Sequence, residues 1–269
     1  MKLLSMTLLI LLFSVVYLTA QDDQLDQLNF EEQNYEQFKE ESTPYFVIGG
    51  GPIMNMMFLN YNDINTQLVD KYFNNKDKFF MDGSFYQFGA QGIISIGLIP
   101  NVRIGIIGLG GQKSLNQTLD TAINSKTYNR NMEITLGYTG INLDYAWVPF
   151  NSIKFAIVPG VTLGWGTIDI KAYQTLKELD FNDIRPESDL ANYNMKLATS
   201  YWHIAPMLNF EYSPTLLSLF RVSVGYTMSF PGTWNFNSNG DSKVNNVPTG
   251  INSNGLTLQF GIILGIFNY

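Results

Sequence analysis

Cysteine is absent from this 269-residue chain, and histidine occurs once. The lack of cysteine excludes disulfides, thiolate metal sites, a catalytic thiol and a lipid anchor attached to cysteine. Charged residues are also scarce, at 14% of the chain, which is low for a soluble domain. The net charge of −7 argues against a nucleic-acid partner, because no basic surface is available to neutralise phosphates.

After the N-terminus the sequence contains no second long apolar run, which excludes a bundle of transmembrane helices. Aromatic residues are nevertheless abundant, at 14%. Few charges, many aromatic residues and no long apolar run together favour an all-β membrane barrel, whose strands conceal their apolar character by alternation.

The first 20 residues have the pattern of an export signal. Lys2 precedes an apolar stretch from Leu3 to Tyr17, and the small residues Thr19 and Ala20 precede a polar sequence. We expect cleavage after Ala20. An uncleaved anchor is the alternative, because the run is just long enough to span a bilayer. Residues 21–43 are rich in Gln, Asp and Glu and are interpreted as an acidic N-terminal periplasmic segment, with the barrel in residues 44–269.

Within residues 44–269 the connections between β-like runs alternate between short and long. Strands are predicted at 45–59, 84–99, 101–113, 130–148, 152–172, 197–212, 216–231 and 255–268. Three connections are tight, whereas 60–83, 114–129, 173–196 and 232–254 are long and polar. Short periplasmic turns alternating with long extracellular loops are typical of outer-membrane barrels. The count of eight antiparallel strands depends on this alternation, with ten as the alternative.

Period-two patterning divides these strands into an apolar and a polar face. In the predicted strand 130–148 the apolar residues change parity, from Met132 through Tyr138 to Ile141 through Trp147. A β-bulge near Thr139 and Gly140 is predicted to restore one continuous face.

The apolar face is the bulky one. Turning it inward, as in a soluble lipocalin-like barrel, would overfill an eight-stranded lumen, so we expect it to face lipid. Aromatic residues fall near both strand ends, as expected for belts at the two bilayer interfaces. The predicted belts consist of Tyr138, Tyr145, Trp147, Trp165, Trp202, Phe210, Tyr212 and Phe230.

The signal peptide, alternating strands, tight turns, long loops and terminal Phe267-Asn268-Tyr269 resemble the eight-stranded outer-membrane barrels related to OmpA, OmpX and OmpW. The resemblance is one of architecture and covers roughly residues 44–269. It implies a location in the cell outer membrane of a Gram-negative bacterium, among lipids and lipopolysaccharide. It also implies that Phe267 and Tyr269 form the signal read by the barrel-assembly machinery.

Charged residues on the predicted inward face are expected to form a lumen network, because unpaired buried charges are costly. The predicted network consists of Arg103, Glu133, Asp144, Lys154, His203, Glu211 and Arg221. The same residues could instead line the constriction of a selective path.

No catalytic arrangement is visible. Ser200 precedes His203 by three positions, which places the two side chains on opposite faces of a strand. No cofactor or metal is expected, because the acidic residues of loop 173–196 match no calcium-loop spacing. In the first long loop Asp63 is predicted to cap a short helix carrying Ile64, Leu68 and Tyr72.

The favoured function is therefore a non-enzymatic outer-membrane barrel with a structural or surface-interaction role. Its long loops could contact an extracellular ligand, with Trp234 and Phe236 of the last loop as a candidate tip. The alternatives are a narrow, porin-like channel similar to OmpW for small or apolar solutes and, third, an outer-membrane lipid-modifying enzyme.

Overall fold

The computed structural model describes residues 45–70, 80–120, 127–150, 154–176, 193–236 and 242–268. The predicted signal peptide, the acidic segment 21–43, Tyr72 and Tyr269 lie outside these residues. Among the described residues no helix is long and apolar enough to cross a bilayer.

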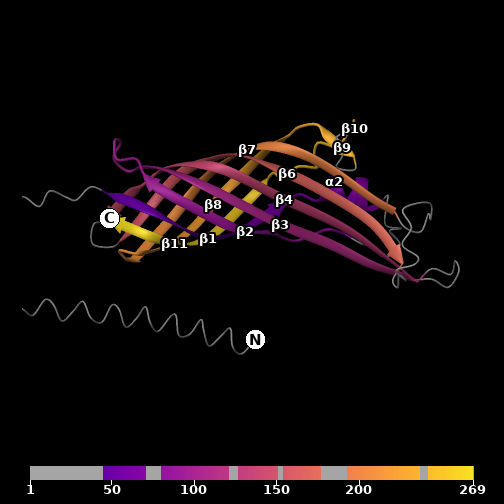
Figure 1. Cartoon of the computed structure of the whole chain (residues 1–269), viewed down its shortest axis with the longest axis horizontal. Helices are drawn as coiled ribbons and strands as arrows, with labels where there is room; N and C mark the ends of the chain where they lie inside the picture. The colour runs from indigo at the N-terminus through magenta and orange to yellow at the C-terminus, as the bar shows by residue number, and fades with distance from the viewer. Residues whose placement is uncertain are drawn as a thin grey trace, which may run out of the picture. The chain divides into compact units, whose positions relative to one another are not determined.

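Eight antiparallel strands close into a barrel (Figure 1), which confirms the predicted architecture. They are β1 (Phe46–Leu59), β2 (Phe85–Ser95), β3 (Val102–Asp120), β4 (Thr127–Tyr145), β6 (Phe155–Leu176), β7 (Tyr193–Thr215), β8 (Ser218–Pro231) and β11 (Gly255–Asn268). Neighbours in sequence pair with one another, β1 pairs with β11, and β6 pairs with β7. The short β5 (Trp147–Phe150) follows β4 after one residue and pairs with β6.

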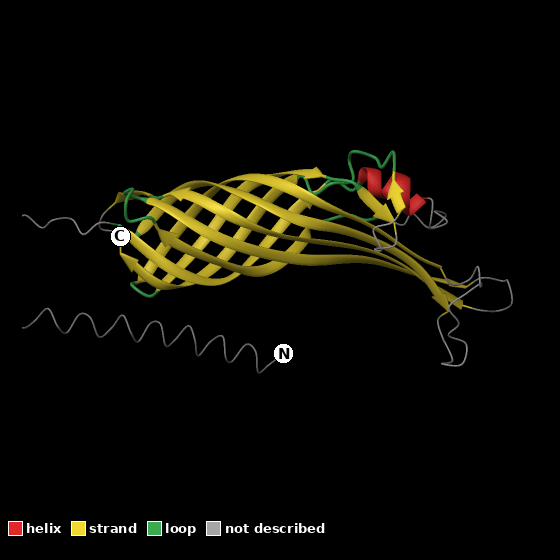
Figure 2. Ribbon diagram, turned by 45° about the horizontal axis from the view of Figure 1, so that its top comes forward, coloured by secondary structure: helices red, strands yellow, loops and turns green. Residues whose placement is uncertain are grey.

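Four of the strands are much longer than the other four. β2 pairs with β3 only as far as Phe88 and Gly110, and β7 pairs with β8 only as far as Tyr201 and Pro231. Beyond these points β3, β4, β6 and β7 continue as a four-stranded sheet, which we call the extension: residues 111–120, 127–136, 167–176 and 193–200. The extension projects from the long-loop end of the barrel (Figure 2). Residues 114–120 and 127–129 of the first predicted loop, and 173–176 and 193–196 of the second, are therefore strand.

The outward face of the barrel is a band of exposed apolar side chains. On β3, β4, β6 and β7, successive rows of cross-strand partners show where this band ends. Ile106, Ile141, Leu163 and Ile204 form one row, and Gly108, Thr139, Trp165 and Trp202 form the next. Farther along, the outward rows become polar, beginning with Gly110, Gly137, Thr167 and Ser200. An apolar band that ends at tryptophan is the lipid-facing surface of a membrane-spanning barrel.

At the same level the inward face changes from polar to apolar. Inside the membrane-facing part the lumen is lined by polar residues such as Asn55, Gln87 and Asn142. Inside the extension most of the buried residues are apolar and include Met132, Ile134, Leu136, Ile168, Ile170, Met195 and Leu197. Where the apolar band ends, the outward face thus changes from apolar to polar and the inward face from polar to apolar.

This exchange explains the parity change in β4 without a bulge. The register of β4 against both neighbours runs unbroken through Thr139 and Gly140, so the predicted bulge is wrong. Even-numbered residues face inward along the whole strand, from Met132 to Asp144. In the extension the outer face of β4 meets water, so its apolar side chains point inward. In the membrane-spanning part the outer face meets lipid, so its apolar side chains point outward.

A short helical segment packs against the inward, apolar face of the extension. It comprises α2 (Asn62–Ile64), which continues into the π-helix η2 (Asn65–Val69), and it buries Ile64, Leu68 and Val69 in the apolar core. The predicted helix is therefore present, but Asp63 does not cap it. The Asp63 carboxylate instead accepts a hydrogen bond from the Gly250 amide at 2.9 Å, and the N-terminus has no side-chain cap.

Two further contacts hold the long loops onto this core. The Asn65 side chain bridges the backbone of Met81, donating to its carbonyl at 2.9 Å and accepting from its amide at 2.7 Å. The short strands β9 (Trp234–Phe236) and β10 (Ser242–Val244) pair with each other, and β9 also pairs with β7. Trp234, predicted at an exposed tip, is buried in the core, whereas Phe236 is partly exposed.

Candidate functional site

The sharpest cluster of functional groups is a charged layer across the lumen near the short-turn end. It is built from two cross-strand pairs, Arg103 with Asp144 on β3 and β4, and Glu211 with Arg221 on β7 and β8. Each pair sits on inward positions of adjacent antiparallel strands, so its side chains are neighbours by register alone. Barrel closure then brings the two pairs face to face.

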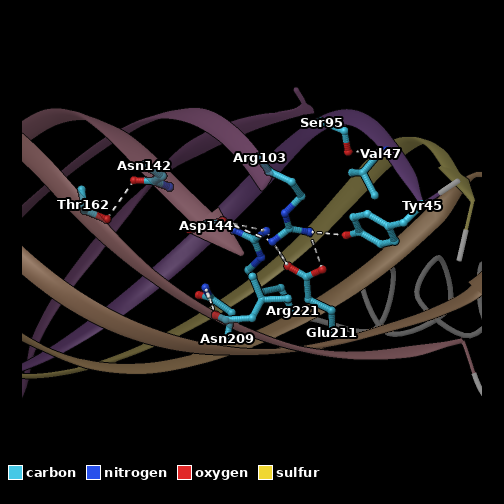
Figure 3. A network of polar contacts seen from close by, with 11 residues as sticks. Tyr45, Val47, Ser95, Arg103, Asn142, Asp144, Thr162, Asn209, Glu211 and Arg221 are labelled. Atoms are coloured by element: carbon cyan, nitrogen blue, oxygen red, sulfur yellow. Dashed lines mark hydrogen bonds and ion pairs between the residues drawn. The ribbon is translucent and has the colours of Figure 1, made fainter. Parts of the chain in front are cut away.

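Glu211 lies at the centre of this layer (Figure 3). Arg103 donates to both of its carboxylate oxygens, at 2.7 and 2.9 Å, and Arg221 Nη2 lies 2.5 Å from Oε1. Arg103 also contacts Asp144 at 3.2 Å, and Arg221 approaches Asp144 at 3.7 Å. All four side chains are at most 5% exposed. Two cations and two anions balance, which is the condition for keeping such charges out of water.

Tyr45 completes the charged layer and was missed in the sequence. Its hydroxyl accepts a hydrogen bond from Arg103 at 2.8 Å. Tyr45 has the same parity as the inward residue Val47, which was the only available signal, but it precedes the first regular strand residue.

Apolar side chains line the lumen beside the charged layer. Val47, Ile93, Leu219, Ile263 and Phe267 form one buried cluster, and Ala146, Ala156 and Val158 form another. On the other side lies a layer of neutral hydrogen bonds, including Asn55 to Gln87 and Thr162 to Asn142, each at 2.8 Å. The apolar core of the extension follows. Layers of different chemistry therefore line the described lumen.

Two predicted members of the network lie elsewhere. Lys154 is exposed at the start of β6, next to a short turn. Glu133 faces outward on the extension, where it pairs with Lys171 at 3.3 Å. Glu133 has odd parity in β4, opposite to Asp144, and assigning both to the lumen required the bulge that is absent.

His203 faces inward and is almost completely buried, but it does not join the charged layer. Glu211 follows it by eight positions in β7, or about 26 Å of strand at the usual rise per residue. Its imidazole packs instead against Tyr138, with ring centroids 4.3 Å apart, and near Tyr201 at 6.0 Å. Neither ring nitrogen has a hydrogen-bond partner among the described residues. Ser200 is exposed on the opposite face of β7, so the two side chains cannot act on one substrate atom.

The belt residues divide into seven that face outward and one that does not. Tyr145, Trp147, Phe210 and Tyr212 are exposed near the short turns, and Trp165, Trp202 and Phe230 are exposed toward the extension. Trp165 and Trp202 are direct cross-strand partners with centroids 6.0 Å apart. Tyr138 is the exception, because its even position in β4 turns it into the lumen.

Phe267 of the predicted assembly signal also points inward, with 1% of its surface exposed. Its partner Tyr269 is outside the described residues.

Outside the barrel wall, burial raises the pKa of Tyr61, which follows β1 and packs with the α2–η2 segment in the apolar core. Within the described part of the chain no cluster of His, Asp or Glu could hold a metal ion.

No protein-family model matches the sequence, and no curated protein does. Among solved structures, a major outer membrane protein from Thermus thermophilus has a TM-score of 0.45 at 9% identity, covering 82% of this chain and 100% of that one. Ail of Yersinia pestis, crystallised with the heparin analogue sucrose octasulfate, has a TM-score of 0.32 at 10% identity, covering 83% and 98%. CarO of Acinetobacter baumannii has a TM-score of 0.31 at 10% identity, covering 84% and 100%. Likenesses this remote say nothing about activity, so the function must be argued from the geometry.

Proposed function

We propose that this protein is a non-enzymatic outer-membrane barrel, closed to solutes, whose role is to hold the extension at the cell surface for interaction. The supporting observation is the exchange of faces at the Trp165–Trp202 row. Below it the protein has the outer surface of a membrane barrel, and beyond it the outer surface of a soluble sheet.

The orientation follows from the connections. Short turns at one end and long connections at the other favour periplasmic turns and an extracellular extension. The lumen supports a closed state, because the charged layer is electroneutral and the α2–η2 segment occupies the apolar core beyond it. A conducting path would have to disrupt ion pairs that are shielded from water.

Solute flux tests this proposal. Purified protein in liposomes is expected to release no more entrapped small solute than empty liposomes do, whereas a general porin releases it quickly. A double variant, Arg103→Ala with Glu211→Ala, removes the bidentate pair and should raise the leak if the charged layer is a seal. Reproducible flux through the unaltered protein would establish the narrow channel instead.

Surface display is tested separately in cells. A cysteine introduced at Asn194, which is exposed at the far end of the extension, should react with a membrane-impermeant thiol reagent added to intact cells. The chain has no natural cysteine to confuse this labelling. A matched cysteine at Lys154 beside the short turns should stay unlabelled until the cells are permeabilised. The reverse pattern would show that the barrel is inserted in the opposite orientation.

A further inference from the structure

The outward face of the extension carries a continuous row of uncharged hydrogen-bonding side chains. Asn116, Asn131, Tyr173 and Asn194 are successive cross-strand partners on β3, β4, β6 and β7. The next row is Thr118, Asn129 and Thr175. Between these two rows lies a groove of about 350 Å³, which we call the amide groove, lined mainly by the first three residues of each row.

The described lining of the amide groove carries almost no charge. Arg130 is its single charged residue, and its Nε donates to Gln174 at 2.5 Å, with both side chains on inward positions of their strands. Asn131 donates to Asn116, and Thr118 to Asn129 at 3.1 Å, so the amides are held in place by one another. The Oδ1 atom of Asn131 is buried without a hydrogen-bond partner among the described residues. This acceptor is shielded from solvent, so a ligand in the groove would hydrogen-bond to the exposed Asn116 and Thr118 side chains.

We propose that the amide groove binds a neutral oligosaccharide, which deepens and rests on the proposed surface role of the extension. Asparagine presents donors and an acceptor in one plane, and threonine hydroxyls do both, so together they can match the hydroxyl groups around a sugar ring. Tyr173, partly exposed between the asparagines, offers an aromatic face for the C–H side of that ring.

Charge decides against an anionic ligand. The row nearer the barrel contains Lys171 and Lys196, but these are occupied by Glu133 at 3.3 Å and Asp169 at 3.0 Å. An acidic saccharide would gain no free cation there. An uncharged one requires none and can use the amide hydrogen bonds at any ionic strength.

Saturation-transfer NMR with the full-length protein in lipid nanodiscs tests the proposal. The probes are maltohexaose, cellohexaose and chitohexaose, and detergents with sugar headgroups are avoided because they would compete. At least one of these neutral hexasaccharides is expected to bind saturably. Tyr173→Ala should weaken that binding roughly tenfold or more, because it removes the aromatic face. Tyr173→Phe, which keeps the ring, should bind like the unaltered protein.

Lys171→Ala provides the control, because it changes the same outward face one row away. It should leave binding unchanged, and heat-modifiable migration on gels should verify that every variant is folded. Saturable binding by none of the three sugars, or equal binding by Tyr173→Ala, would overturn the proposal. Binding only to a sulfated sugar, lost in salt and in Lys171→Ala, would also overturn it. A barrel that conducts solute yet binds the sugar would instead refute only the closed state.

Discussion

Replacement of Glu211 by glutamine tests the charged layer directly. Glutamine has nearly the same shape, so Glu211→Gln changes the charge with little change in packing. In the native layer Glu211 receives two hydrogen bonds from Arg103 and one ion pair from Arg221. The variant leaves two buried arginines facing Asp144 alone.

Breaking one partner of a buried ion pair typically costs about 3–5 kcal/mol, because the remaining charge is neither paired nor hydrated. We expect Glu211→Gln to fall in that range, since the side chain is completely buried. The matched control is Glu133→Gln on the extension. Its partner Lys171 is 40% exposed, so the loss should be about 0–1 kcal/mol.

Urea titration in phospholipid vesicles, followed by tryptophan fluorescence, measures both free energies of unfolding. The double variant Glu211→Gln with Arg221→Gln restores neutrality and should be more stable than the sum of the two single losses, by about 1 kcal/mol or more. A loss below about 1 kcal/mol for Glu211→Gln, or strict additivity in the double variant, would refute the view that charge balance stabilises the layer.

Three other substitutions test the remaining features. Leu208→Arg, in the lipid-facing band, should cost about 2–4 kcal/mol of unfolding free energy, whereas Asn194→Arg on the extension should cost about 0–1 kcal/mol; equal costs would contradict the assigned membrane boundary. Gly89→Ala should destabilise by about 1–3 kcal/mol, because an added Cβ would collide with the Gly108 carbonyl, whereas Gly97→Ala meets nothing within 4 Å and should be neutral in the same titration. Asn65→Ala removes the bridge to Met81 and should speed hydrogen exchange at the Met81 amide without shifting the barrel's unfolding midpoint; an unchanged exchange rate would show that the bridge does not protect that amide.

The strands were predictable because their signals are local. Turn residues such as Pro100 and Asn101 lie between β2 and β3, and Asn101 adopts the positive φ of 63° that asparagine tolerates in tight turns. Side-chain parity in β7, β8 and β11 depends only on the period of two. The assignment of Arg103, Asp144, Glu211 and Arg221 to the lumen followed from parity together with their distance from the turns.

Other features depended on the environment of each face, which parity does not specify. Met132 and Ile141 are both apolar, yet one is buried in the extension and the other faces outward in the apolar band. When β4 is assumed to have one environment along its whole length, its sequence requires a bulge, and Glu133 and Tyr138 are assigned to the wrong faces. The strand is continuous, and the change from lipid to water occurs along it.

By itself the sequence determined the alternation of side chains along each strand, where the tight turns lie and which charges cannot face lipid. Only the tertiary structure decided which side of each strand is buried at each level, and that Arg103 meets Glu211. The contact between Arg103 and Glu211 depends on barrel closure, which brings together residues 108 positions apart in the chain. No local sequence pattern predicts a contact between residues so far apart in the chain.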